Sequence, residues 1–247
     1  MNKFLSFDGI QGYVVASGYK GIAYPFDQSV DRSTTFWIRT THSGNDATIC
    51  YWGAYLNEDL GDGEENRIRL IQGHLELFSR TSGRRTDSLL NDGTWHHVAF
   101  VYNTSDPYSR LRNFANAVVY VDGALDNGRV FENGIAGIST PGEQDVIIGA
   151  RPARTGGVVD LFPGDLDEFA VYRAAITIPT ITGSYNNGVR GADLSTIGQF
   201  ENLHLWYRMG DEAGDTVPSG MLNTGTLIDR SYYGRHGTTF SGISIGE

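Results

Sequence analysis

Carboxylate side chains crowd the short segment Asp165-Leu166-Asp167-Glu168. Retaining hydrolysis of a glycosidic bond requires two carboxyl groups about 5–5.5 Å apart, one acting as nucleophile and the other as acid. If the segment is a strand, Asp165 and Asp167 share one face and Glu168 points the other way. The position that would carry the second glutamate holds Ala170. The pair is incomplete, so we expect a protein that is not an enzyme.

Two adjacent histidines, His96 and His97, are the next candidates for chemistry. Neighbouring residues of a strand face opposite sides of the sheet, so the two imidazoles cannot hold one metal ion in a regular strand. We therefore interpret them as packed or surface histidines rather than as a metal site or a catalytic base.

Several loops combine aromatic rings with polar side chains. A sugar stacks its C–H face on an aromatic ring, while fixed polar groups hydrogen-bond its hydroxyls. Tyr and Arg also anchor protein interfaces, so these loops predict either a glycan or a protein partner. The candidate binding residues are Tyr19, Tyr24, Tyr108, Arg110, Arg151 and Arg154.

Composition and charge exclude several classes. The chain of 247 residues has 32 Gly without a G-X-Y period, which excludes collagen, and its 40% hydrophobic content excludes wholesale disorder. The net charge of −10 repels phosphate backbones and acidic lipid headgroups, so we expect no nucleic-acid partner. Cys50 is the single cysteine, so no disulfide forms within the chain, and we expect it to be a buried core residue.

The N-terminal segment Met1–Asp8 lacks the apolar stretch of 7–15 residues that a secretory signal contains. No later stretch is long enough to span a bilayer, so we expect no membrane insertion. The sequence predicts a protein that is made in the cytoplasm and either stays there or is released by lysis.

Apolar and polar residues alternate with a period of two along most of the chain, between clusters of Gly, Asn and Asp. This pattern is typical of strands joined by turns, so we expect strands to position these side chains. We expect tight turns at Gln72-Gly73 and Asp122-Gly123, and one short helix that begins near Thr177 and ends at Asn186-Asn187-Gly188. This pattern predicts an antiparallel sandwich. The expected strands are Phe4–Asp8, Tyr13–Ser17, Thr34–Thr40, Ala47–Ala54, Asn66–Gln72, His74–Arg80, Trp95–Tyr102, Ala117–Asp122, Asp145–Ala150, Asp165–Tyr172, His204–Met209 and His236–Phe240.

One of these segments, Trp95–Tyr102, carries bulky groups on both faces and is therefore expected to be an interior strand, with Trp95 in the core. It also resembles the D-G-x-W-H-H-V-A strand of laminin-G-like domains. Val119–Gly123 resembles the v-Y-v-D-G strand of the same family, and Gly164–Tyr172 resembles its G-x-I-D-E-v-r-i-Y strand. With the similar opening Leu5–Val14, the resemblance spans residues 4–188 and implies a concanavalin-A-like jelly roll.

The C-terminal segment departs from the family order. Leu205–Glu212 and Leu227–Thr238 resemble an element, W-x-f-D-E followed by D-x-S-G, that usually precedes the first strand. Either the order is circularly permuted or a second repeat is truncated, and we favour permutation because the termini of sandwiches lie close together. We expect a single domain over residues 1–247, in which residues 201–247 close the sandwich.

The resemblance also implies that Asp167, Asp229 and the Asp8-Gly9 turn meet near the closing edge of the sandwich, where some relatives hold structural calcium. Calcium prefers several oxygen ligands at about 2.3–2.6 Å, so Asp167, Asp229 and Asp8 are the candidate ligands. The alternative is that Asp167 and Asp229 bond to turn amides. A second acidic run, Asn57–Asn66, is interpreted as a solvated hairpin tip.

The segment after Leu205 is also similar to virion proteins of tailed bacteriophages, especially marine ones. Extracellular animal relatives carry a signal and a disulfide, and this chain has neither. We therefore expect a non-enzymatic structural or decorating virion protein that contacts other virion proteins, copies of itself or cell-surface glycans. The alternative is a soluble carbohydrate-binding lectin. The third hypothesis is a laminarinase-like glycoside hydrolase, whose E-x-D-x-x-E pattern fails here at Ala170.

Overall fold

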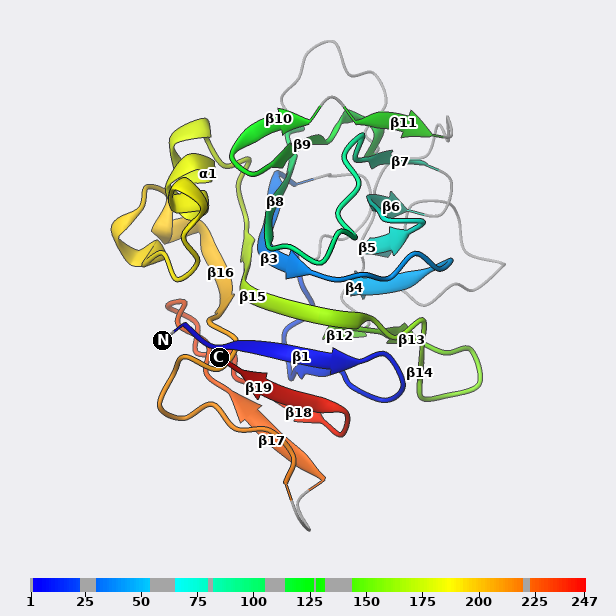
Figure 1. Ribbon diagram of the computed structural model, residues 1–247. Helices are drawn as coiled ribbons and strands as arrows, with labels where there is room; N and C mark the ends of the chain where they lie inside the picture. Colours follow the sequence, from blue (N-terminus) through cyan, green and yellow to red (C-terminus); the bar gives the residue numbers. More distant parts are fainter. Residues whose placement is uncertain are drawn as a thin grey trace.

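The computed structural model describes residues 2–22, 30–53, 65–79, 82–104, 114–126, 128–131, 144–219 and 223–247 (Figure 1). Two antiparallel sheets form a sandwich, as the sequence predicts, with one short α-helix beside it. In this part of the chain, no helix is long and apolar enough to cross a membrane.

The first sheet has eight described strands and includes both β1 and β19, which pair with each other. Its order is β10 (Ala124–Asp126), β9 (Val118–Val121), β8 (His96–Tyr102), β3 (Arg32–Arg39), β15 (Pro163–Tyr172), β1 (Phe4–Asp8) and β19 (Ile243–Gly246), with β16 (Leu203–Tyr207) paired to β15.

The second sheet has nine described strands, and a small two-stranded sheet lies beside it. The order is β11 (Arg129–Phe131), β7 (Ser82–Arg85), β6 (His74–Ser79), β5 (Glu65–Ile71), β4 (Ala47–Gly53), β12 (Gln144–Ile148), β2 (Val14–Ala16), β18 (Gly237–Phe240) and β17 (Thr224–Leu227); β13 (Arg151–Pro152) pairs with β14 (Val158–Val159).

The main core lies between the inner faces of the two sheets. It contains Trp52, Phe36, Phe100 and Phe169, which are all at most 1% exposed, and Cys50 is buried there as expected. The predicted tight turns form at Gln72-Gly73 and Asp122-Gly123, where all four residues have positive φ. β8 lies between β3 and β9, which confirms that it is an interior strand.

A second hydrophobic cluster lies on the outer face of the first sheet, turned away from the second sheet. Helix α1 (Ile178–Tyr185) contributes Ile181 to it, and Ala170, Tyr172 and Trp206 contribute from the sheet. The helix ends at Asn186 in a left-handed conformation, as predicted. Short 3-10 helices occur at η1 (Phe114–Asn116), η2 (Asn186–Gly188), η3 (Leu194–Thr196) and η4 (Phe200–Asn202).

The helix begins at the predicted residue. Thr177 holds the cap position, but no side-chain cap hydrogen bond forms, and its hydroxyl lies 3.1 Å from the hydroxyl of Thr180. The turn before the helix is held in part by Gln199, whose Oε1 accepts from the backbone N–H of Thr177 at 2.8 Å.

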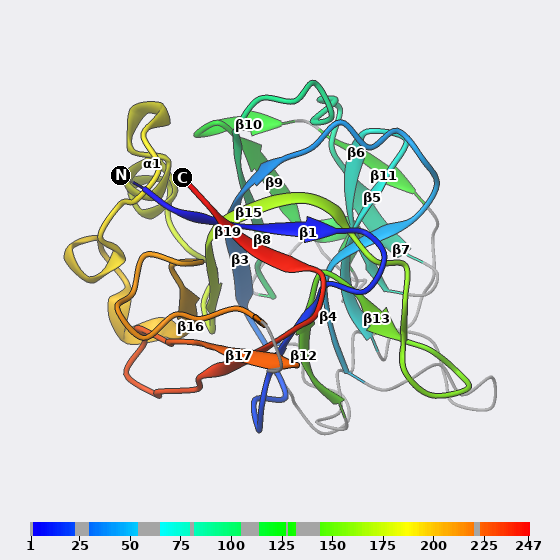
Figure 2. The same cartoon turned by 60° about the horizontal axis from the view of Figure 1, so that its bottom comes forward.

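The C-terminal strands lie within both sheets. β16 pairs with β15 and β19 pairs with β1 in the first sheet, while β18 pairs with β2 in the second. Phe4 is the register partner of Gly246, and the two ends of the chain lie near each other (Figures 1 and 2).

A β-bulge interrupts β15. Glu168 has a φ of 48°, and the register between β15 and β3 shifts between Asp167 and Ala170. The carboxylate of Glu168 accepts a hydrogen bond from Nε1 of Trp206, which belongs to the outer cluster. The expectation from simple alternation, that Glu168 points away from the face of Asp167, is therefore wrong, because the extra residue of a bulge turns the side chain back.

Candidate functional site

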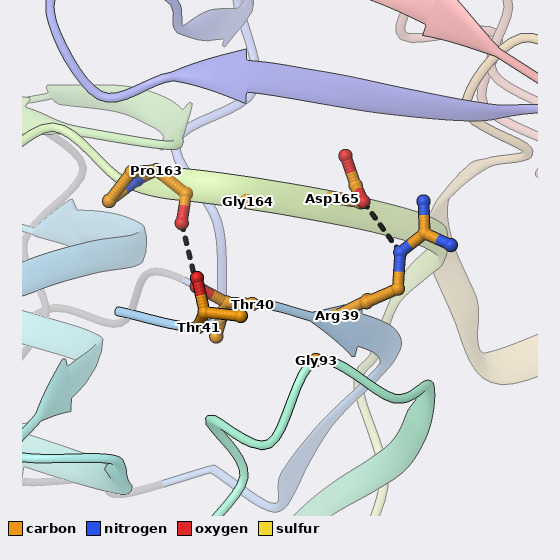
Figure 3. A pocket seen from close by; sticks show the side chains of 7 residues that line it. All are labelled: Arg39, Thr40, Thr41, Gly93, Pro163, Gly164 and Asp165. Carbon is orange, nitrogen blue, oxygen red and sulfur yellow. Dashed lines mark hydrogen bonds and ion pairs between the residues drawn. The ribbon is translucent and has the colours of Figure 1, made fainter. Parts of the chain in front are cut away.

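A pocket of about 310 Å³ opens where β3 ends and β15 begins, beside the loop that leads into β8 (Figure 3). The loop closes one side of the pocket, and the two strands provide the other sides. Its lining residues are Arg39, Thr40, Thr41, Gly93, Pro163, Gly164 and Asp165.

The backbone around the pocket is closely packed and hydrogen-bonded. Oγ1 of Thr40 donates to the carbonyl of Pro163 at 2.7 Å, and the backbone N–H of Gly93 donates to the carbonyl of Thr40 at 3.0 Å. Gly164 has a φ of 154°, and a Cβ there would lie only 2.8 Å from the carbonyl oxygen of Arg39. Glycine is therefore required for this close approach.

The charged wall of the pocket is an ion pair. Nε of Arg39 lies 2.7 Å from Oδ2 of Asp165, and the two side chains remain 35% and 15% exposed (Figure 3). The guanidinium also lies over two rings, 4.8 Å from the centroid of Phe4 and 4.9 Å from that of Trp95. The pair is thus held in place before any ligand arrives, and both residues still present polar atoms to solvent.

Trp95 is half-buried and lies outside the core, contrary to expectation. It packs edge-on against Phe4, with ring centroids 5.3 Å apart, and the guanidinium of Arg190 lies 4.1 Å from its ring. Its partners are therefore two arginines and one ring on the outer face of the first sheet, the face to which alternation along β8 also directs Ala99 and Val101. Asp167 holds Arg190 in this position through a 2.7 Å ion pair.

The lining residues offer both donors and acceptors of hydrogen bonds. Arg39 and the exposed Thr41 can donate hydrogen bonds to a hydroxyl-rich ligand, and Asp165 can accept them. Among the lining residues, all of which are described, Asp165 is the only carboxylate, so the pocket lacks the second carboxyl that glycoside hydrolysis requires.

Glu168 is buried away from these lining residues. Its carboxylate accepts from Nε1 of Trp206 at 2.6 Å and pairs with Nε of Arg208 at 3.1 Å. Burial raises the pKa of Glu168 to about 7, which the nearby Arg208 opposes. Burial and the neighbouring Glu168 also raise the pKa of Asp167.

Ser244 lies in the run Gly242-Ile243-Ser244-Ile245-Gly246, which has the Gly-x-Ser-x-Gly spacing of one hydrolase class. That chemistry requires the serine on a sharp turn from a strand into a helix. Here Ser244 lies in the regular strand β19, opposite Ser6 of β1, so the geometry does not fit.

The three candidate calcium ligands each bond to separate donors. Asp8 accepts from the backbone N–H groups of residues 10, 11 and 12 at 2.8–3.0 Å. Asp229 accepts from four donors, including the backbone N–H groups of Trp206 and Arg235. Asp167 pairs with Arg190. Within the described residues, no group of three or more His, Cys, Asp or Glu side chains could hold a metal, so these carboxylates do not fit a shared calcium ion.

The candidate binding residues are dispersed. Tyr19 is only 3% exposed and lies under the guanidinium of Arg235, 4.2 Å from its ring centroid. Arg151 pairs with Asp160, and Arg154 is exposed. The remaining three, Tyr24, Tyr108 and Arg110, lie outside the described residues, as does most of the acidic run Asn57–Asn66.

Arg151 belongs to a chain of ion pairs on the second sheet. Each member has an oppositely charged neighbour at 3.7 Å or less, so all three carboxylates are neutralised and the four arginines leave one excess positive charge. In order, the members are Arg85, Glu76, Arg69, Asp46, Arg67, Asp160 and Arg151.

The comparisons with known proteins agree with this fold. A family model described as the concanavalin A-like lectin/glucanases superfamily matches residues 9–182. A search of curated proteins finds no match for the chain.

Several solved structures are similar to this chain. A Bacteroides ovatus protein described as a candidate carbohydrate-binding protein has 18% identity and a TM-score of 0.57; the match covers 100% of this chain and 60% of that one. The heptameric SAP-like pentraxin of Limulus polyphemus has 17% identity and a TM-score of 0.53, covering 99% and 94%. The IT-sialidase CBM40 of Ruminococcus gnavus has 13% identity and a TM-score of 0.52, covering 73% and 95%; it has also been solved with α2,3-sialyllactose.

Identities at this level establish the fold alone. None of these comparisons supports the expected relation to bacteriophage virion proteins.

Proposed function

Because the chain belongs to the concanavalin A-like lectin/glucanases superfamily, we propose that it is a carbohydrate-binding protein and that the pocket beside Arg39 and Asp165 holds a sugar. The observation that carries this proposal is the Arg39–Asp165 pair at the mouth of a 310 Å³ pocket. Pockets for small ligands begin at about 300 Å³ and use a few fixed polar groups for specificity.

We propose that the protein binds its sugar without catalysing a reaction. The single carboxylate among the lining residues supports this, because a glycoside hydrolase needs two. Of the hypotheses drawn from the sequence, the soluble lectin is the one that the carbohydrate-binding neighbours favour. We therefore do not propose a virion role.

The test is a glycan array with neutral, sialylated, uronate and sulfated oligosaccharides, followed by calorimetric titration of each bound glycan. Arg39→Gln removes the partner of Asp165, and Thr41→Tyr fills the pocket from an exposed position. We expect each variant to weaken binding about tenfold or more, since one hydrogen bond to a charged group contributes about 1.5–3 kcal/mol.

Arg129→Gln is the matched control, because Arg129 is exposed on β11 of the other sheet. It should bind as the unmodified protein does. Absence of binding to every glycan would overturn the proposed function, whereas unchanged binding by Arg39→Gln and Thr41→Tyr would overturn only the assignment to this pocket.

A further inference from the structure

Two adjacent tyrosines stand on a surface turn at the far end of β15 from the pocket. Tyr232 is 74% exposed and Tyr233 is 47% exposed. Tyr232 packs against Phe200, with ring centroids 4.7 Å apart, and Tyr233 packs against His204 at 4.5 Å. His204 follows Leu203, the register partner of Tyr172 at the end of β15, whereas the pocket lies at its start.

The turn that carries these tyrosines is rigid. Asp229 holds it by accepting hydrogen bonds from the backbone N–H of Ser231 at 2.9 Å, from its hydroxyl at 2.7 Å and from the backbone N–H of Arg235 at 2.7 Å. The same carboxylate also accepts from the backbone N–H of Trp206 in β16, which attaches the turn to the first sheet. The rings are therefore presented in a fixed orientation, which reduces the entropy lost on binding.

The side chain of Arg235 packs against the inner side of this turn. Its guanidinium lies between two rings, 4.2 Å from the centroid of Tyr19 and 4.0 Å from that of Tyr233. Nη1 also donates to the carbonyl of His204 at 2.7 Å, and the hydroxyl of Tyr233 lies 3.2 Å from Nε2 of the same histidine. The stacked guanidinium fixes Tyr233 and places a positive charge beside it.

Two arginines, Arg173 and Arg235, lie beside His204 at this surface, although the net charge of the chain is −10. Burial, followed by the charges of Arg235 and Arg173, lowers the pKa of His204 to about 4, so its imidazole is neutral at pH 7. Arg173 is exposed, and Arg230 is paired with Glu212 at 3.4 Å. The carboxylate of Asp229 lies beneath the turn, bonded to four donors, and Glu201 beside Phe200 is exposed to solvent, so the charges that act on His204 are those of Arg235 and Arg173.

We propose that Tyr232, Tyr233, His204 and Arg235 form a second carbohydrate-binding surface, which takes a sugar ring bearing an anionic group. This aromatic platform rests on the proposed function, carbohydrate binding, and adds a separate site with a different preference. The tyrosine rings stack on the C–H face of the sugar, and the cationic field attracts its carboxylate or sulfate.

Charge also argues against a second copy of the chain as the occupant. A two-fold contact brings the same patch of two copies together, so the arginines of one copy, Arg173 and Arg235, would lie close to those of the other. Like charges placed across an interface disfavour association. An anionic ligand avoids this repulsion.

The experiment compares three probes at the platform: α2,3-sialyllactose, which carries a carboxylate; a heparin tetrasaccharide, which carries sulfates; and neutral lactose. Binding is measured by calorimetry and by shifts of the Tyr232 ring resonances in NMR spectra. We expect at least one anionic probe to bind about tenfold more tightly than lactose and to weaken as salt is added.

The double variant Tyr232→Ala/Tyr233→Ala should lose the preferred probe with a fall in Tm of only about 2–4 °C, because both rings are exposed and a cation–π contact at an exposed site contributes about 1 kcal/mol or less. Ile10→Ala, at a residue 78% exposed, is the control for loss of exposed apolar surface. Arg39→Gln should keep binding at the platform, which separates this site from the pocket.

Unchanged binding in the double tyrosine variant would overturn the platform, as would equal affinity for lactose and both anionic probes. A dimer in sedimentation that disappears in the double variant would also overturn it, because the surface would then be a contact between copies. If Arg39→Gln alone abolishes glycan binding, the proposed function is supported and the assignment of a second binding surface to the platform is overturned. Absence of glycan binding by the unmodified protein overturns both.

Discussion

Helix α1 covers one half of the outer face of the first sheet and leaves the other half open, although the same strands run through both. In the covered half, Tyr172 and Trp206 are at most 1% exposed and pack against Ile181 of the helix. In the half that the helix leaves open, the same face of β15 carries Asp165, which is 15% exposed and pairs with Arg39, and Asp167, which is buried beneath its partner Arg190.

Strand β3 runs from the half of the face that helix α1 covers into the half that it leaves open. Trp37 is 1% exposed and stacks on Tyr185, the last residue of α1, with ring centroids 5.8 Å apart. Two residues later on the same face, Arg39 is uncovered and lines the pocket. Helix α1 therefore determines which part of this face is buried as core and which part is available for binding.

The largest expected effect concerns the tryptophan of the covered half. Trp206→Ala leaves a cavity in the outer cluster and removes the donor to Glu168, so we expect it to reduce the free energy of unfolding by about 3–5 kcal/mol. Denaturant titration measures this loss.

Trp95→Ala is the matched change in the open half. Because Trp95 is half-buried, we expect a loss of about half that size, together with weaker glycan binding as Arg39 loses a ring beneath it. Equal destabilisation by the two variants would contradict the distinction between the covered and the open half.

The second expected effect is a pH dependence that originates at the bulge between the two halves. The pKa of Glu168 is about 7 in the folded protein and about 4.5 when unfolded, so the folded state binds more protons between these values. Stability therefore falls as pH rises from 4.5 to 7, by up to about 3 kcal/mol. Glu168→Gln removes this contribution, and the slope that remains comes in part from Asp167, whose pKa is also raised.

The measurement is the free energy of unfolding at intervals from pH 4.5 to 8. Glu201→Gln, on an exposed residue, is the control and should preserve the slope. An identical pH profile for Glu168→Gln and the unmodified protein would show that this carboxylate does not carry the charge change.

The smallest expected effect is at the pocket loop of the open half. His96 bridges two carboxylates, with Nδ1 2.8 Å from Asp122 and Nε2 3.2 Å from Asp92, the neighbour of Gly93 in the pocket wall. The hydrogen bond with Asp122 raises the pKa of His96 above 6.5, with Asp92 acting in the same direction. Its contribution to stability is complete below pH 6.5 and is lost as pH rises through the folded pKa, since neutral imidazole can donate only one hydrogen bond.

Exposed pairs of this kind contribute up to about 1 kcal/mol, so we expect a fall in Tm of about 2–4 °C or less across this range. The fall should be absent in His96→Gln. Titration of the His96 imidazole by NMR tests the cause directly, and a midpoint below 6.5 would contradict it.

The regular parts of the fold could be predicted from the sequence because their signals are local. Alternation in β8, the Asp122-Gly123 turn and the left-handed Asn186 each depend on neighbours in sequence. The exposure of Trp95 could not be predicted, because alternation places it on the face of Ala99 and Val101 but does not show that helix α1 leaves this end of the face open.

The pocket and the platform depend on long-range contacts. Arg39 and Asp165 are 126 residues apart and form no motif, and the exposure of Tyr232 depends on how Asp229 folds the turn. A resemblance to laminin-G-like domains could place Asp229 in a turn, but the side chains that bond to it follow only from the packed sheets.

The extra residue in β15 changes which residues, even-numbered or odd-numbered, face the sandwich core. Before the bulge, the even-numbered Leu166 lies in the sandwich core, and after it the odd-numbered Phe169 and Val171 do. If Glu168 stayed and the strand ran without a bulge, Ala170 and Tyr172 would exchange sides with Phe169 and Val171; deletion of Glu168 would leave these residues on their present sides. The bulge thus absorbs one residue of a ten-residue strand, so that Leu166, Phe169 and Val171 all reach the sandwich interior while Ala170 and Tyr172 face the helix-covered surface.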